Sequence, residues 1–175
     1  MKKISVLVIM MLLITFSFTF SQSKEFYKNI QTLSPVLGLN SYTVPVGVNF
    51  EYGITDNIGI GGTAMLWFWS NEYWSNSLVG LSFDGAYHFT SLDVEKLDLF
   101  AGAGLGISIY SYSWKDSQSG NAKGGAGSSG LYLEPFIGAR YYFKQNMAVF
   151  SRLYVHFIGD WGGAGGIIGI SFKLK

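Results

Sequence analysis

The chain ends in a strict alternation of apolar and polar positions. Between Gly166 and Lys175, Ile168, Ile170, Phe172 and Leu174 alternate with Gly169, Ser171, Lys173 and Lys175. A period of two is that of a β-strand, whose successive side chains point to opposite faces. One face of this strand is apolar, and the other carries only glycine, serine and lysine. The strand therefore separates an apolar environment from a polar one.

The same alternation recurs from Thr32 onward, in segments of about ten residues. Eight strands are predicted, at 32–40, 44–52, 57–68, 79–89, 97–110, 132–143, 147–157 and 166–175. Short turns are expected at 53–57, 90–96 and 144–146, and longer loops at 70–76, 113–129 and 159–163. Pro35, Pro45 and Pro135 interrupt the pattern, so we expect bulges or strand ends there.

The first 21 residues have the pattern of a secretory signal peptide. Lys2 and Lys3 precede an apolar run that ends before Ser21. A membrane-anchor helix is the alternative, but the run is short and no basic cluster follows it. We therefore predict a cleaved signal peptide at 1–21, a polar periplasmic lead-in at 22–31 and a barrel domain at 32–175.

The composition indicates a membrane protein that crosses with strands. Charged residues make up 13% of the chain and hydrophobic residues 49%, whereas an average soluble domain has about 25% charged residues. After the signal, no apolar run approaches the roughly 18 residues of a spanning helix. Loss of Lys2 and Lys3 leaves ten basic residues against eleven acidic ones, so nothing suggests nucleic-acid binding. There is no cysteine, and hence no disulfide or thiolate metal site.

Three features favour lipid over water outside a barrel of this kind. The polar face carries few charges, it is rich in glycine as a narrow lumen requires, and aromatic residues gather at strand ends. One set is Phe50, Tyr52, Tyr87, Phe89, Tyr141 and Phe143; the other, expected to form an outer aromatic girdle, is Trp67, Trp69, Trp74, Tyr110, Tyr112, Trp114 and Trp161. The predicted fold is all-β, an eight-stranded antiparallel up-and-down transmembrane β-barrel. A soluble, lipocalin-like binder is the less favoured alternative.

Three segments resemble the small OmpA/OmpX-type outer-membrane barrels. They are Gly-Ile-Thr-Asp-Asn at 53–57, Phe-Ala-Gly-Ala-Gly-Leu-Gly at 100–106 and Phe-Ile-Gly-Ala-Arg-Tyr-Tyr-Phe at 136–143. The resemblance implies a porin-like, monomeric protein in the outer membrane of a Gram-negative cell, in contact with membrane lipids including the lipopolysaccharide leaflet. It also implies insertion by the outer-membrane assembly machinery, although Lys-Leu-Lys follows Phe172 where many such barrels end on an aromatic residue.

The polar face holds the candidate chemistry. Its titratable residues are Glu51, Asp84, His88, Asp98, Glu134, Arg140, Arg152, His156 and Lys173. Counting back from the turns places His88 opposite Asp98, and His156 near Glu134. We interpret the set as a structural ion-pair network that plugs the lumen.

A lipid A-modifying barrel enzyme, which would use histidine, serine and an acid, is the sharper alternative. His156 has no serine two residues away, so we expect no catalytic residues. Two separated histidines do not predict a metal site, and no cofactor is expected.

The expected role is structural, or one of surface interaction through the outer loops. The alternative is a conduit or binder for small hydrophobic molecules, with Trp67, Trp69 and Tyr110 lining its entrance.

Overall fold

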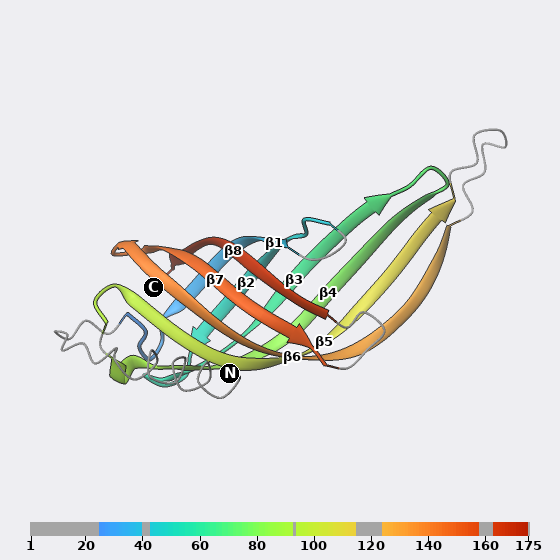
Figure 1. The fold of residues 1–175 in the computed structure, drawn as a ribbon. Coiled ribbons are helices and arrows are strands. Elements are labelled where there is room, and N and C mark those ends of the chain that lie inside the picture. The colour runs from blue at the N-terminus through green and yellow to red at the C-terminus, as the bar shows by residue number, and fades with distance from the viewer. Residues whose placement is uncertain (1–24, 40–42, 93, 115–123, 158–162, 175) are drawn as a thin grey trace, which may run out of the picture.

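The computed structural model describes residues 25–39, 43–92, 94–114, 124–157 and 163–174. Eight strands follow one another antiparallel around a closed barrel, in which β1 also pairs with β8 (Figure 1). The elements are β1 (Gln31–Leu39), β2 (Val46–Gly53), β3 (Ile58–Ser70), β4 (Trp74–His88), the short 3-10 helix η1 (Thr90–Leu92), β5 (Leu97–Trp114), β6 (Gly124–Lys144), β7 (Met147–His156) and β8 (Gly163–Lys173). Among the described residues, no helix is long and apolar enough to cross a membrane.

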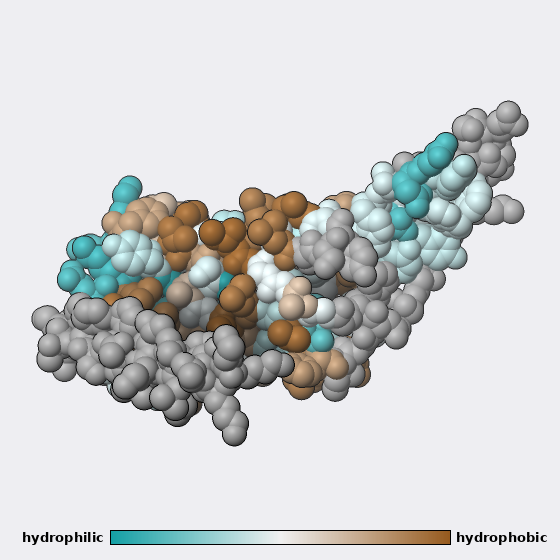
Figure 2. All heavy atoms as spheres, in the orientation of Figure 1, coloured by the Kyte–Doolittle hydropathy of each residue, from teal (hydrophilic) through white to brown (hydrophobic). Residues whose placement is uncertain are grey.

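The alternation in the sequence separates the two faces of the barrel wall. Large apolar side chains such as Phe83, Leu105 and Leu153 lie on the outside, with 61–65% of their surface exposed. On the face shown in Figure 2, hydrophobic residues (brown) gather across the middle of the molecule, and we call this zone the belt. Because water does not tolerate so large a contiguous apolar surface, this belt is the part of the barrel that lipid covers.

The two ends of the barrel differ in height. The turns that join β2 to β3, β4 to β5 and β6 to β7 are short, and the ends of β1 and β8 lie beside them; we call this the terminal end. At the opposite end, β3 to β6 rise beyond the other strands (Figure 1). Since outer-membrane barrels keep their short turns in the periplasm, the taller end faces out of the cell.

We call the taller part the outer extension. It consists of residues 67–70, 74–78, 109–114 and 124–131, because β2 pairs with β3 only as far as Leu66 and β7 pairs with β6 only from Phe136. The ladders from β3 to β5 continue without a break to the pairs Ser70–Ser75 and Trp74–Trp114. In the β5–β6 ladder the register shifts between Ile109 and Ser111.

The extension corrects two expected loops. Most of 70–76 is strand, and 113–129 is strand up to Trp114 and again from Gly124; its middle, 115–123, lies outside the described residues. The β3–β4 connection is a tight turn in which the Asn71 Oδ1 atom accepts hydrogen bonds from the backbone amides of Tyr73 and Trp74, at 3.1 and 2.7 Å. Serine and glycine suggested loops by composition, but cross-strand pairing with aromatic neighbours holds them in a sheet.

The three prolines lie where pairing is interrupted or begins. The β1–β8 register runs through Leu33–Phe172 and resumes only at Val36–Gly169, so Pro35 lies in the gap. Pro45 immediately precedes β2, and Pro135 immediately precedes the first β6–β7 pair, at Phe136. These are positions where a missing backbone donor costs little.

Candidate functional site

Near the terminal end, four lumen side chains close into a ring. The two guanidinium Nη atoms of Arg140 donate to Glu51 and to Asp98, the latter at 3.1 Å. The His88 Nδ1 atom lies 2.7 Å from Asp98 and its Nε2 atom 2.8 Å from Glu51. All four side chains are buried. We call this set the Arg140 cluster; it joins β2 and β6 across the lumen, so it fastens walls that share no backbone ladder.

A second cluster lies farther toward the outside. Arg152 donates to the Asp84 Oδ2 atom at 2.8 Å and also to Glu134, whose other oxygen lies 2.6 Å from the His156 Nε2 atom. Asp84 further accepts hydrogen bonds from the hydroxyls of Thr63 and Ser82, at 2.5 and 2.7 Å. We call Asp84, Glu134, Arg152 and His156 the Arg152 cluster. Each of its carboxylates has at least two partners, as a charge needs away from water.

Phenylalanine rings fill the space between the two clusters. The Arg140 guanidinium lies 4.9 Å from the centre of the Phe100 ring and 5.3 Å from that of Phe150. The Arg152 guanidinium lies 3.8 Å above Phe136. Cavities in this region are about 10 Å³ each, which is room for about one water molecule. Side chains, rather than water, therefore occupy this part of the lumen.

Lys173 lies apart from both clusters, at the terminal end. Its Nζ atom is 2.8 Å from Glu25 and 4.0 Å from the centre of the Tyr142 ring. Phe26 is 1% exposed and stacks on the His88 ring, with centroids 3.4 Å apart and an interplanar angle of 4°. Residues 25–30 thus cover the Arg140 cluster from below, and we call them the N-terminal cap.

The backbone of the N-terminal cap is fastened to β2. The Asn29 amide donates to the Gly53 carbonyl at 2.8 Å, and the Gly53 amide donates to the Ile30 carbonyl at 2.9 Å. A side chain at Gly53 would lie within 2.5 Å of the Tyr27 carbonyl oxygen, so glycine permits this approach. The sequence interpretation treated 22–31 as a polar lead-in and missed this docking. Phe26 and Ile30, two apolar residues in an otherwise polar stretch, are the feature of the sequence that could have indicated it.

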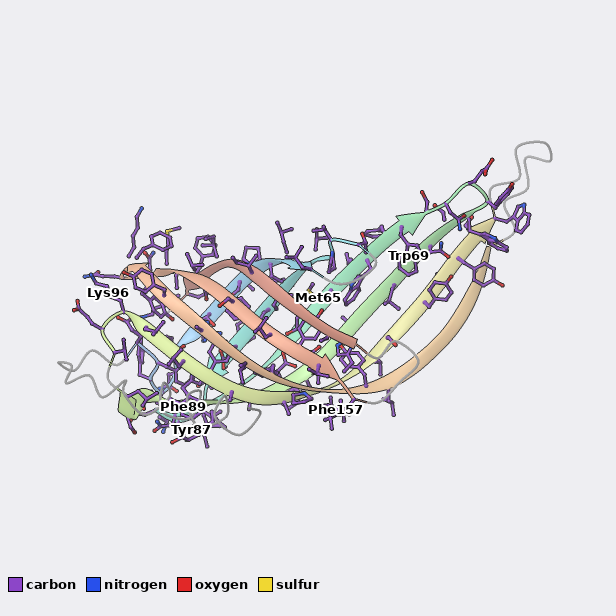
Figure 3. All side chains as sticks on the ribbon, in the orientation of Figure 1. Met65, Trp69, Tyr87, Phe89, Lys96 and Phe157 are labelled. Atoms are coloured by element: carbon purple, nitrogen blue, oxygen red, sulfur yellow. The ribbon has the colours of Figure 1, made fainter. Side chains whose placement is uncertain are left out.

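Those residues of the expected outer aromatic girdle that the structure describes lie on the inward face of the barrel wall instead. Trp67 is 6% exposed inside the barrel, and Trp69 and Tyr110 pack against the same core. Met65 and Trp69 lie on the same strand, β3, and Trp69 belongs to the outer extension (Figure 3). The sequence prediction assigned these rings to the girdle because they lie near the ends of the strands. Along each strand, however, they occupy the alternate positions whose side chains point into the lumen, and this determines the face on which they lie. Trp74, Tyr112 and Trp114 continue the same face, and Trp161 lies outside the described residues.

The aromatic residues of the terminal end do lie on the outside. Phe50, Tyr87, Phe89, Tyr141 and Phe143 are 40–52% exposed. Figure 3 shows Tyr87 and Phe89 side by side at this end, and their ring centroids are 5.4 Å apart. Rings at this level fit the interface between hydrocarbon and water.

The geometry offers little for catalysis. Both ring nitrogens of His88 contact carboxylate oxygens, which leaves neither nitrogen to act on a substrate. Ser82 donates to Asp84 rather than to a histidine. Within the described part of the chain, no group of three or more histidine, aspartate or glutamate residues could hold a metal ion. The arrangement is one of mutual charge neutralisation across a narrow lumen.

Comparison with known proteins places this fold among small outer-membrane barrels. No family model matches the chain, and no curated protein sequence matches it. The N-terminal barrel of Pseudomonas aeruginosa OprF is similar in structure, with a TM-score of 0.59 and 17% identity over 84% of this chain and 98% of that one. Ail, the attachment invasion locus protein of Yersinia pestis, gives a TM-score of 0.54 and 13% identity, over 83% and 97% of the two chains. OprG of Pseudomonas aeruginosa gives 0.56 and 9%, over 86% and 98%.

These similarities agree with the closed ladder of eight antiparallel strands. The chain is therefore an eight-stranded β-barrel with the fold of the small OmpA/OmpX-type outer-membrane proteins.

Proposed function

We propose that this protein is a non-conducting outer-membrane barrel whose outer extension serves as an interaction surface outside the cell. It inserts as a monomer, with lipid around the belt and the lipopolysaccharide leaflet around its upper edge. The assembly machinery for outer-membrane barrels delivers it there after removal of the signal peptide. In this proposal the barrel within the lipid belt has the structural role, and the outer extension, where β3 to β6 continue beyond the belt, has the binding role.

The observation that carries the proposal is the double closure of the lumen. The Arg140 cluster and the Arg152 cluster each join opposite walls, and the rings of Phe100, Phe136 and Phe150 lie between them. An ion that crossed the barrel would have to break both sets of charge pairs in turn. Each break would leave a buried charge without its partner. The contacts in the lumen therefore favour a structural role, in which they hold the barrel rigid, over a role in transport.

The outer extension supplies the interactive part. Long β-strands that project past their neighbours are unnecessary for spanning a bilayer, which takes about 9–11 residues per strand, whereas β5 has 18 residues. Ail, one of the proteins with this fold, is named as an attachment invasion locus protein. That name supports a surface role for the fold and indicates no particular partner for this chain.

Single-channel conductance tests the closed lumen. Purified, refolded protein in a planar bilayer should show no stepwise current, while a water-filled porin in the same bilayer serves as positive control. The extension should not alter this result, since closure lies below it. Reproducible openings of the wild-type protein would contradict the proposal and favour a conduit for small molecules.

A further inference from the structure

The alternation of polar and apolar residues inverts where the strands leave the lipid belt. Within the belt the outward positions are apolar, and Phe68, Ile109 and Leu131 carry that apolar face into the base of the outer extension. Beyond them, the outward positions of β3 to β5 are serine: Ser70, Ser75, Ser77, Ser111 and Ser113. The inward positions there are Trp69, Trp74, Asn76, Tyr110, Tyr112 and Trp114. Toward the tip of the extension, the convex side is therefore a water-facing serine surface, and the concave side is aromatic.

The concave rings form a continuous row, which we call the aromatic row (Trp69, Trp74, Tyr110, Tyr112 and Trp114). Trp69 stacks on Tyr110 with centroids 5.9 Å apart, and Tyr110 lies 6.1 Å from Tyr112. Tyr112 meets the edge of Trp74 at 5.4 Å, and Trp74 meets Trp114 at 4.2 Å. Trp114 is 42% exposed. The row leads from the barrel mouth to the tip of the extension.

Polar groups without charge accompany the row. The Tyr110 hydroxyl donates to the Asn76 Oδ1 atom at 2.5 Å, and Asn76 lies between Trp69 and Tyr112 in the ladder. No residue of the outer extension itself is charged. Glu72 lies in the adjoining turn, and Lys115, Asp116 and Lys123 belong to 115–123, which lies outside the described residues. Aromatic faces with amide and hydroxyl groups beside them suit a ligand that has apolar C–H faces and many neutral hydroxyls.

We propose that the aromatic row binds an uncharged polysaccharide chain, with pyranose rings lying on the tryptophan and tyrosine faces. The aromatic row itself has no cation with which a polyanion could pair. A wholly apolar ligand would offer no hydrogen bond to the polar groups beside the row, of which the Tyr110 hydroxyl and the Asn76 oxygen already pair with each other. An extended saccharide satisfies both kinds of surface at once.

The position of the row indicates an external chain rather than the glycans of neighbouring lipids. The row lies on the inward face of the outer extension, which continues beyond the ends of β1, β2, β7 and β8 (Figure 1). Lipid-borne glycans surround the barrel and so meet the serine side. The occupant is therefore a soluble polysaccharide that approaches from outside the cell.

This inference rests on the proposed surface role and deepens it, and its test is independent of conductance. Intrinsic tryptophan fluorescence of the full protein in lipid nanodiscs is titrated with uncharged probes, namely cello-, laminari- and malto-oligosaccharides. A heparin fragment serves as the anionic probe and a long-chain alcohol as the apolar one. We expect saturable binding of at least one neutral oligosaccharide, and no saturable binding of the other two probes.

Variants assign the signal to the row. Trp74→Ala and Tyr112→Ala should each weaken binding by about tenfold, as expected for the loss of one stacking ring, whereas Tyr112→Phe should retain most of it. Ser75→Ala and Ser113→Ala, on the convex side of the same strands, are matched controls that should leave affinity unchanged. Isothermal calorimetry gives a readout that does not depend on the tryptophan removed.

Three outcomes overturn the inference: no neutral oligosaccharide binds, the heparin fragment or the alcohol binds instead, or Trp74→Ala and Tyr112→Ala leave the affinity at the wild-type value. Should a variant lose its fold, judged by circular dichroism, Trp114→Ala at the end of β5 replaces it. A silent conductance trace together with absent sugar binding would reject this inference while leaving the closed-lumen proposal intact.

Discussion

At the scale of single residues, glycines and large lumen side chains are matched across neighbouring strands. A Cβ atom added at a lumen glycine would collide with a ring or a carboxylate, as in the pairs Gly104–Asp84, Gly106–Tyr132, Gly138–Phe100 and Gly165–Tyr154. Each glycine thus makes room for the side chain that closes the lumen. The glycine-rich polar face is a consequence of narrowness, because eight strands leave an interior that side chains alone can fill.

Arg152 is the residue on which the outer closure depends, and its removal gives the first stability prediction. Arg152→Ala leaves Asp84 and Glu134 buried without their cation, so the free energy of unfolding should fall by about 3–5 kcal/mol. Reversible unfolding by urea in lipid vesicles measures the change. Arg152→Lys should recover only part of it, because an ammonium group cannot reach both carboxylates in a planar fork.

Lys96→Ala is the matched control for that measurement. Its pair with Glu95, at 3.7 Å, is exposed, so the change should stay within about 1 kcal/mol. If Arg152→Ala is no more costly than Lys96→Ala, then the Arg152 cluster does not hold the walls together.

At the scale of elements, the N-terminal cap packs against the barrel, and we expect it to contribute to the stability of the fold. Phe26→Ala removes a ring that lies flat on His88 and is 1% exposed, so we expect a loss of about 3 kcal/mol in unfolding free energy. Lys28→Ala, in the same cap but exposed, should change it by less than about 0.5 kcal/mol. Equal effects of the two substitutions in the urea experiment would mean that the cap does not contribute to stability. Cleavage after Ser21, which stays a prediction, would leave the cap in place.

The sequence predicted the strands and some of the lumen pairs, for identifiable reasons. The period of two marked eight strands, and short turns fixed the register well enough to place His88 by Asp98 and His156 by Glu134. The partner of Arg140 on β2, Glu51, was not predictable in this way. That contact crosses the lumen, so it depends on how the strands stagger when the sheet closes.

The outer extension was missed for a different reason. Alternation shows that two faces differ, but it does not show where lipid ends and water begins. Trp69 and Tyr110 were therefore assigned to the outer girdle because they lie near strand ends, although they occupy alternate positions that point inside the barrel. Only the ladder from β3 to β5, continuous past the last apolar outward position, shows that the apolar face changes sides there.

At the scale of the whole molecule, β5 runs from the lipid belt into the outer extension, so its outward face contacts hydrocarbon along one part and water along the other. Leu105 lies on the outside of β5 within the belt and is 61% exposed, which in a bilayer means contact with hydrocarbon. Ser111, six positions later on the same face, belongs to the outer extension. One strand and one face thus offer a direct comparison between lipid and water.

The last prediction uses that pair. Leu105→Arg should lower the unfolding free energy in lipid vesicles by about 2–4 kcal/mol, since it places a charge near the middle of the belt, whereas Ser111→Arg should cost about 0–1 kcal/mol. Both arginines project from the outer wall, so neither disturbs the lumen clusters, and circular dichroism verifies that each variant retains its strands. A large cost at Ser111 would put the extension inside the bilayer and remove the basis for an external surface. Small costs at both positions would mean that the apolar belt does not face lipid.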